Sequence, residues 1–166
     1  MAEETVWRGS VSQWKNFGFF LVQALLAVAI ITIFAVLSRF SSPEIEKFRP
    51  YGLLLLAVPI FIAGRRYLQT KCTVYEVTTE RLKTTSGILS KVTDTLEFYR
   101  IKDIEKRQPF LYRLCGIENV QLNTSDTSSP VVVINAVSHD IGLADVIRNA
   151  VEKVRQQKGV REIDVE

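Results

Sequence analysis

The first half of the chain contains two long runs of hydrophobic residues separated by a short polar link. No Lys, Arg, Asp or Glu occurs between Lys15 and Arg39. The 23 uncharged positions 16–38 predict a helix about 34 Å long, which is enough to cross a hydrocarbon core of ~30 Å. A helix in a soluble domain normally carries a polar face, and this run has none. We therefore predict a transmembrane helix here.

The second run, residues 50–64, is shorter and gives a helix of about 22 Å. It reaches the length of a membrane span only if Arg65 to Leu68 continue the helix, with the arginine heads extended toward the lipid headgroups. Pro59 would kink this helix, which membrane helices tolerate. The alternative is one buried core helix of a soluble protein. We favour a two-helix transmembrane hairpin over residues 16–68.

The segment before the first run, residues 1–15, contains both tryptophans of the chain. Trp7, Val11 and Trp14 are spaced so that they share one face of a helix, and Trp is favoured at membrane interfaces. This pattern predicts a short in-plane helix with Trp7 and Trp14 as interfacial anchors. A soluble tail with a chance apolar stripe is the alternative. The acidic start and the length of the first run argue against a cleaved signal peptide.

Two spans would place both ends of the chain on the same side of the membrane. Five Lys and Arg residues flank the spans on that side and three lie in the link, which favours the cytoplasm for the ends. The two cysteines, Cys72 and Cys115, agree with a reducing compartment. We expect a multi-pass protein of the cell membrane whose N-terminus and second half are cytoplasmic.

From Cys72 onward the apolar residues alternate with polar ones, as in β-strands. Asp94 falls on the apolar side of this alternation, which indicates a strand end or an edge strand. A helical pattern follows, for which Asp140 is a candidate N-cap and Gly159 a candidate stop. The predicted strands are 72–79, 81–89, 92–98, 101–108, 119–124 and 131–137, and the apolar helix positions are Leu143, Val146, Ile147, Ala150, Val151 and Val154.

This order of elements predicts a membrane-anchored α+β protein. The transmembrane hairpin would be followed by a strongly bent β-sheet or barrel, residues 69–158, capped by its C-terminal amphipathic helix. Residues 110–116 read as one helical turn, because Pro109 ends the preceding strand and Gly116 stops the helix. We predict that residues 159–166 form a tail.

The net charge of +3 is unevenly distributed along the chain. Residues 65–113 carry a charge of +5, residues 114–166 carry −3 and residues 1–64 carry +1. Anionic lipid attracts Lys and Arg close to the membrane surface, whereas a solvated basic face without a ligand is the alternative. The residues that we predict to contact the membrane surface are Arg65, Arg66, Lys71, Arg81 and Lys83.

The sequence offers little catalytic chemistry. Its only histidine, His139, lies beside the predicted C-terminal helix, where a local hydrogen bond is a more common role than catalysis. No metal-ligand spacing and no glycine-rich phosphate loop occur, so we expect no metal and no cofactor. A nucleic-acid partner is not expected either, because the C-terminal part of the chain is acidic.

Several short motifs resemble one known family. The stretch "YEVTTERL" at residues 75–82, the glycine at 87, "YRIKDI" at 99–104, Gln108 and "RLCGIENVQLNT" at 113–124 are similar to the bacterial pleckstrin-homology-like, membrane-flanked domain family, as a small two-span member. The resemblance implies a seven-stranded bent sheet capped by a helix, without catalytic residues. Glu118 departs from the family pattern, which tends to have glycine there. Small members resemble partners of larger relatives that carry several copies of the domain.

These observations lead to a functional expectation. We expect a PH-like scaffolding or assembly module, tethered to the membrane and without catalysis, within a homo- or hetero-oligomeric complex. Its partners would be a second copy or a larger multi-copy relative, together with membrane lipids that include anionic headgroups. The first alternative is a domain that recognises a lipid headgroup through its basic face. The second is an enzyme, or an accessory of a membrane enzyme, of unknown chemistry.

Overall fold

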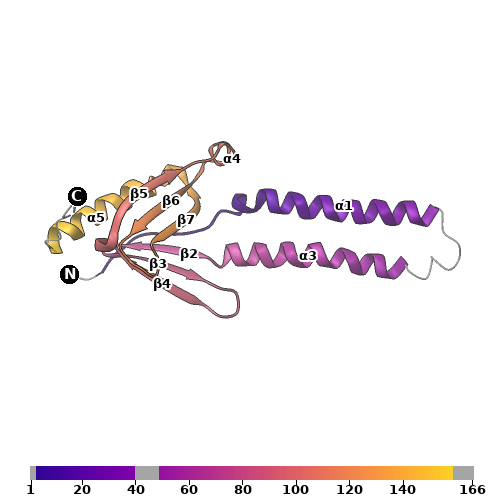
Figure 1. Ribbon diagram of the computed structural model, residues 1–166, viewed down its shortest axis with the longest axis horizontal. Coiled ribbons are helices and arrows are strands. Elements are labelled where there is room, and N and C mark those ends of the chain that lie inside the picture. The colour runs from indigo at the N-terminus through magenta and orange to yellow at the C-terminus, as the bar shows by residue number, and fades with distance from the viewer. Residues whose placement is uncertain (1–2, 40–48, 159–166) are drawn as a thin grey trace. The chain divides into compact units, whose positions relative to one another are not determined.

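The computed structural model describes residues 3–39 and 49–158. These residues form two compact units, of which one contains residues 16–68 and the other, called the head below, contains residues 3–15 and 69–158 (Figure 1). The predicted tail, 159–166, and most of the predicted link lie outside the described residues.

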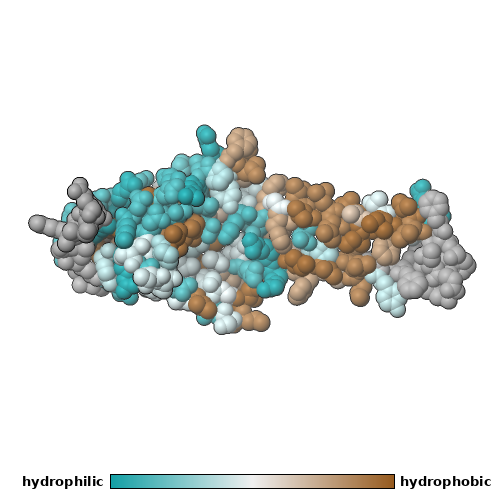
Figure 2. All heavy atoms as spheres, viewed as in Figure 1, coloured by the Kyte–Doolittle hydropathy of each residue, from teal (hydrophilic) through white to brown (hydrophobic). Residues whose placement is uncertain are grey.

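The unit of residues 16–68 contains two helices, α1 (Phe17–Arg39) and α3 (Arg49–Lys71), although the last residues of α3 belong to the head. No side chain of α1 is buried, and Figure 2 shows apolar residues over its surface. Among the described residues, the helical segment Gln13–Arg39 is long and apolar enough to cross a membrane. One candidate span of the expected two-helix hairpin is therefore found, and the second span stays a prediction.

The predicted in-plane helix at the N-terminus is wrong. Residues Thr5–Ser10 form strand β1, and a 3-10 helix, η1 (Gln13–Asn16), leads into α1. Strand β1 pairs antiparallel with β2, so that Gly9 lies opposite Tyr75. Trp7 packs against the head core and over Gly9, where an added Cβ would lie 2.3 Å from the Trp7 ring. The N-terminal segment is therefore part of the head.

The head contains two antiparallel sheets, of strand order β1-β2-β3-β4 and β5-β6-β7, with helix α5 after the last strand (Figure 1). This bears out the PH-like α+β fold with its C-terminal helix. The strands are β1 (Thr5–Ser10), β2 (Val74–Thr78), β3 (Arg81–Ser86), β4 (Val92–Glu97), β5 (Ile101–Arg107), β6 (Ile117–Thr124) and β7 (Val131–Ser138). The helices are η2 (Phe98–Arg100), α4 (Phe110–Leu114), η3 (His139–Ile141) and α5 (Leu143–Lys158).

The alternation of the third predicted strand is only partly confirmed. Leu96 and Phe98 are buried, but Val92 is exposed although it was expected on the same inner face. Strand β4 is the last strand of its sheet, and its residues from Val92 to Thr95 are exposed. Asp94 therefore lies on an edge strand, where a charged residue is tolerated because water reaches both faces.

Helix α5 closes the core as its periodicity predicts. Leu143, Ile147 and Val154 are buried together with residues from both sheets, and only Val146 of the predicted stripe is partly exposed. Asp140 is not the N-cap of this helix, because it lies within η3, and Gly142 with a φ of 59° separates it from α5. Gly142 instead accepts the first helical hydrogen bonds, from Asp145 and Val146.

A β-bulge in β7 binds the part of the head that precedes α1. The register moves from Glu118 opposite Val137 to Val120 opposite Ile134, which leaves one extra residue in β7. Ala136 takes up the bend with a φ of 50°, and its amide donates to the Asn119 side chain at 2.8 Å. Its carbonyl accepts from the Ser12 amide at 3.0 Å. Glu118 itself has no positive φ, so no glycine is required there.

Candidate functional site

Three of the predicted membrane contacts, Arg65, Arg66 and Lys71, lie on α3. Arg65 and Arg66 are exposed, and Lys71 is the exposed last residue of the helix. The Arg66 Nε donates to the Asn16 side chain at 3.1 Å, and its guanidinium lies 5.6 Å from the centre of the Phe19 ring. Arg66, in the C-terminal part of α3, therefore contacts the start of α1, whereas Arg65 has no such partner among the described residues.

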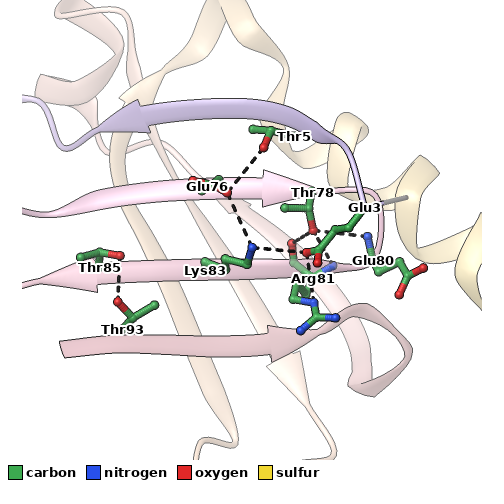
Figure 3. Close-up of polar contacts among 9 residues, drawn as sticks. All are labelled: Glu3, Thr5, Glu76, Thr78, Glu80, Arg81, Lys83, Thr85 and Thr93. Carbon is green, nitrogen blue, oxygen red and sulfur yellow. Dashed lines mark hydrogen bonds and ion pairs between the residues drawn. The ribbon is translucent and has the colours of Figure 1, made fainter. Parts of the chain in front are cut away.

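The other two predicted contacts, Arg81 and Lys83, lie on strand β3 and share one carboxylate. Glu3 Oε1 lies 3.1 Å from Arg81 Nε and 3.5 Å from Lys83 Nζ, and Lys83 Nζ is also 3.8 Å from Glu76 Oε1 (Figure 3). The Arg81 contact is an ion pair rather than an aligned hydrogen bond. Two cations thus face two carboxylates, so this face of the sheet offers little net positive charge to an anionic ligand.

The turn between β2 and β3 fixes the position of this cluster. The Thr78 hydroxyl donates to the Arg81 carbonyl at 2.8 Å and accepts from the Arg81 amide at 3.0 Å. The register then places Thr78 opposite Thr5 and Lys83 opposite Glu76. Arg81 consequently lies at the turn end of β3, and the opposite end of β3, Ser86, leads into the turn before β4.

The charges of the cluster act on Glu3. The neighbouring Thr78 side chain lowers the pKa of the Glu3 carboxyl, and the charges of Arg81 and Lys83 lower it further. A second ion pair lies elsewhere in the head, where Arg100 Nη1 is 2.8 Å from Asp126 Oδ2. Hydrogen bonds from Ser128, followed by the contact with Arg100, lower the pKa of Asp126. Both sites are salt-bridged surface structures rather than open receptors for anions.

Sequence reasoning missed a buried carboxylate, Glu118, whose residue is 0% exposed. Its Oε2 lies 2.6 Å from His139 Nδ1 and 3.7 Å from Lys106 Nζ, and its Oε1 has no hydrogen-bond partner. His139 therefore makes a side-chain hydrogen bond, although its partner is distant in the sequence rather than local as predicted. Such a pair can hold the start of β6 against η3. The three groups are separated in the sequence, and no spacing signal could have identified them.

A small groove lies between the edge strand β5 and helix α5. It encloses about 170 Å³, which is below the ~300–1,000 Å³ of typical small-molecule sites. Arg155 closes one side by donating to the Ile101 carbonyl at 2.6 Å. In the described part of the chain, no group of three or more potential metal-ligating side chains occurs. The groove is lined by Ile101, Lys102, Asp103, Ile104, Arg148, Val151, Glu152 and Arg155.

Comparisons with known proteins agree with this fold. The model of the family described as "Bacterial PH domain" matches residues 17–159. Among solved structures, the chain is similar to a "Vps36 N-terminal PH domain", with 18% identity, a TM-score of 0.40, and coverage of 54% of this chain and 68% of that one. No curated protein matches. PH domains are generally non-catalytic modules that bind proteins or lipids. Because the family model covers most of the sequence, the protein belongs to the bacterial PH domain family.

Proposed function

We propose that this protein is a membrane-tethered PH-like scaffolding module that binds another protein at the membrane surface. The observation that carries the proposal is the character of α1, which has 23 residues and no buried side chain. Exposing such an apolar helix to water is unfavourable, by about 25 cal/mol per Å² of apolar surface. Insertion into a bilayer removes that cost, which supports α1 as the tether.

The pairing of β1 with β2 constrains how the tether is built. Strand β1 precedes α1, strand β2 follows α3, and the two are hydrogen-bonded neighbours in one sheet. If α1 crosses a membrane, the chain must cross again before β2, because both strands lie in the same folded head. This supports α3 as the returning segment, despite its lower hydrophobicity, with its large apolar side chains exposed: Leu54, Leu55, Val58, Ile60 and Phe61.

The side of the membrane follows from the charges that flank the helices. More Lys and Arg residues flank the ends of the proposed pair of helices on the head side than lie in the link, and positive residues favour the cytoplasmic side. We therefore place the head in the cytoplasm. This orientation rests on charge alone.

Protein binding is favoured over recognition of a small molecule because the head exposes sheet edges rather than a large pocket. Among the described strands, β4 pairs only with β3 and ends its sheet. Such an edge pairs readily with a strand from another chain. Tethering also raises the local concentration of the head, so a weak contact suffices for assembly. The partner is proposed to be a second copy or a larger relative with several such domains.

Native mass measurement in mild detergent tests the assembly role. The proposal predicts an oligomer, or a co-purifying protein that carries the same type of domain. A matched variant, Thr95→Pro, removes a backbone donor from the edge strand β4 and is expected to weaken the assembly, whereas Thr127→Pro in the loop before β7 is the control. A lone monomer with no co-purifying protein would contradict the scaffolding role.

Recognition of a lipid headgroup is the second candidate, and the exposed basic residues of α3 support it. The test compares the full-length protein and the Arg65→Ala and Lys71→Ala variants, each reconstituted with neutral or anionic lipid. Headgroup recognition predicts that anionic lipid stabilises the parent protein and that added salt weakens this effect. Equal stability in the two lipids would exclude it. Arg81→Ala and Lys83→Ala are expected to leave the stabilisation by anionic lipid unchanged, because Glu3 and Glu76 already neutralise these cations.

A further inference from the structure

Two apolar tips of the head have no protein covering among the described residues. The first is the turn between β3 and β4, where Leu89 is fully exposed and Ile88 is partly exposed. Gly87, with a φ of 118°, shapes this turn, because an added Cβ would lie 1.8 Å from the Ser90 carbonyl oxygen. The exposure of Leu89 is therefore set by a turn geometry that glycine makes possible.

The second tip is the short helix α4. Its Phe110, Leu111 and Leu114 are 73%, 60% and 71% exposed. Tyr112 and Cys115 instead pack against the core and hold the helix in place. The helix therefore turns one side toward the protein and presents three large apolar side chains outward. In Figure 2, apolar residues are visible at the places that Figure 1 gives to α4 and to the β3–β4 turn.

Strand register places the first tip at one particular end of the head. Val74, the first residue of β2, pairs with Thr85, and the β3–β4 turn begins beyond the pair of Ser86 and Val92. Only Cys72 and Thr73 separate β2 from the end of α3. The turn therefore lies at the end of the head where the chain enters from α3, which is called the helix end below.

Backbone hydrogen bonds place α4 at the same end. The amide of Val11, close before α1, donates to the Thr73 carbonyl at 3.4 Å, and Ser12 donates to Ala136 at 3.0 Å. Three residues after Ala136, the His139 amide donates to the carbonyl of Gly116, which follows α4, at 2.9 Å. Both apolar tips therefore belong to the helix end of the head, and Figure 1 shows them at one end of the two sheets.

The charges beside the tips are positive. Lys91 follows Leu89 by two residues, Arg113 lies within α4, and both side chains are exposed and have no ion pair among the described residues. Apolar side chains flanked by Lys or Arg are typical of segments that lie in a membrane interface, where the cations reach the headgroups. A protein interface would favour fewer lysines and a matching acidic surface.

We propose that the β3–β4 turn and α4 insert into the interfacial layer of the same bilayer that holds α1. This inference rests on the proposed membrane tether and adds a second contact that fixes the orientation of the head. Leu89, Phe110, Leu111 and Leu114 enter the boundary between headgroups and acyl chains, while Lys91 and Arg113 contact lipid phosphates. The β2–β3 turn and the β6–β7 loop, at the other end of the head, face water and leave the ion pairs of Arg81 and Arg100 exposed to solvent.

Site-directed fluorescence on the full-length protein tests the proposal. The background replaces both native cysteines, as Cys72→Ser and Cys115→Ala, and single cysteines are introduced as Leu89→Cys or Leu111→Cys. Thr127→Cys, on the exposed β6–β7 loop, is the matched control, and Ile31→Cys on α1 reports insertion of the tether. Each variant carries an environment-sensitive dye in vesicles of phosphatidylcholine with or without phosphatidylglycerol. Unchanged thermal unfolding of each variant shows that the head is intact.

The proposal predicts that the labels at 89 and 111 report an apolar environment and are quenched several-fold more strongly by lipid-borne quenchers than the label at 127. If the labels at 89 and 111 report the same aqueous environment as the label at 127, while the label at 31 reports lipid, the tips do not insert. The proposal is then overturned, whereas the tether stands. If the label at 31 also reports water, the tether itself fails. If the apolar signal at 89 and 111 disappears when the protein is diluted into excess lipid, a second copy covers the tips and the lipid proposal is overturned.

Discussion

The buried Glu118 provides a direct test of how the head accommodates a carboxyl group in its interior. Two groups approach its Oε2, namely His139 at 2.6 Å and Lys106 at 3.7 Å. Distance favours the histidine as the partner that offsets the cost of burial. Removing a hydrogen bond to a charged group costs about 1.5–3 kcal/mol when the contact is fully buried. The His139 side chain is 50% exposed, so the expected loss for His139→Ala is lower, about 1–2 kcal/mol.

The Lys106 contact is expected to matter less. Its Nζ lies beyond hydrogen-bond distance and its side chain is 38% exposed, so Lys106→Ala should cost less than about 1 kcal/mol. For a head of this size, the histidine variant should lower the melting temperature by roughly 4–16 °C. In a Glu118→Gln background, the cost of His139→Ala should fall, because no charge is then left without a partner.

Denaturant unfolding of the full-length protein in detergent measures these free energies. Trp7 packs against the head core, so its fluorescence reports unfolding of the head. His139 is not the main partner of Glu118 if Lys106→Ala lowers the free energy of unfolding more than His139→Ala does. The same conclusion follows if His139→Ala lowers the free energy of unfolding equally in the parent protein and in the Glu118→Gln background.

Three further predictions concern the head. Gly116→Ala should lower the free energy of unfolding by about 1–2 kcal/mol, the cost of a positive φ. Gly87→Ala should lower it by more, because its φ is also positive and only the Cβ at 87 meets backbone atoms; equal costs would contradict the clash. The pKa of Glu3 is lowered from 4.5, first by the neighbouring Thr78 side chain and then by nearby cations. Its stabilisation is therefore present above the unfolded pKa and is lost as the pH falls through the lower folded value, so hydrogen exchange of β1 should accelerate below pH 4.5 in the parent protein but not in Glu3→Gln. Phe98→Ala, which removes a ring with 0% exposure, should cost about 3–5 kcal/mol in the same denaturant assay, and a cost below 1 kcal/mol would contradict its central place in the core.

The elements that sequence predicted well are those with local signals. Helix α5 carries a stripe at helical spacing, and α4 lies between Pro109, which ends a strand, and Gly116, which adopts a φ of 63°. The run before Arg39 is uncharged over its whole length, so its helix needs no tertiary information. In each case, neighbouring residues decide the conformation.

The features that sequence missed depend on partners far away in the chain. Strand β1 is short and contains Gly9, and it becomes a strand only because β2, more than sixty residues later, pairs with it. The same pairing explains why Trp7 packs against the core rather than serving an in-plane helix. The neutralisation of Arg81 and Lys83 depends on Glu3 in the same way, so a count of basic residues overestimated the positive face.

The proposed tether consists of α1 and α3, which would hold the head on one side of a membrane. Labelling of single cysteines with a membrane-impermeant reagent, in sealed membrane vesicles of known orientation, tests it most directly. The proposed tether predicts that Thr127→Cys and Val6→Cys react from the same side, and that Ser38→Cys, at the far end of α1, reacts only from the other side. Equal reactivity of all three from one side, or loss of the protein from the membrane in plain buffer, would contradict the account.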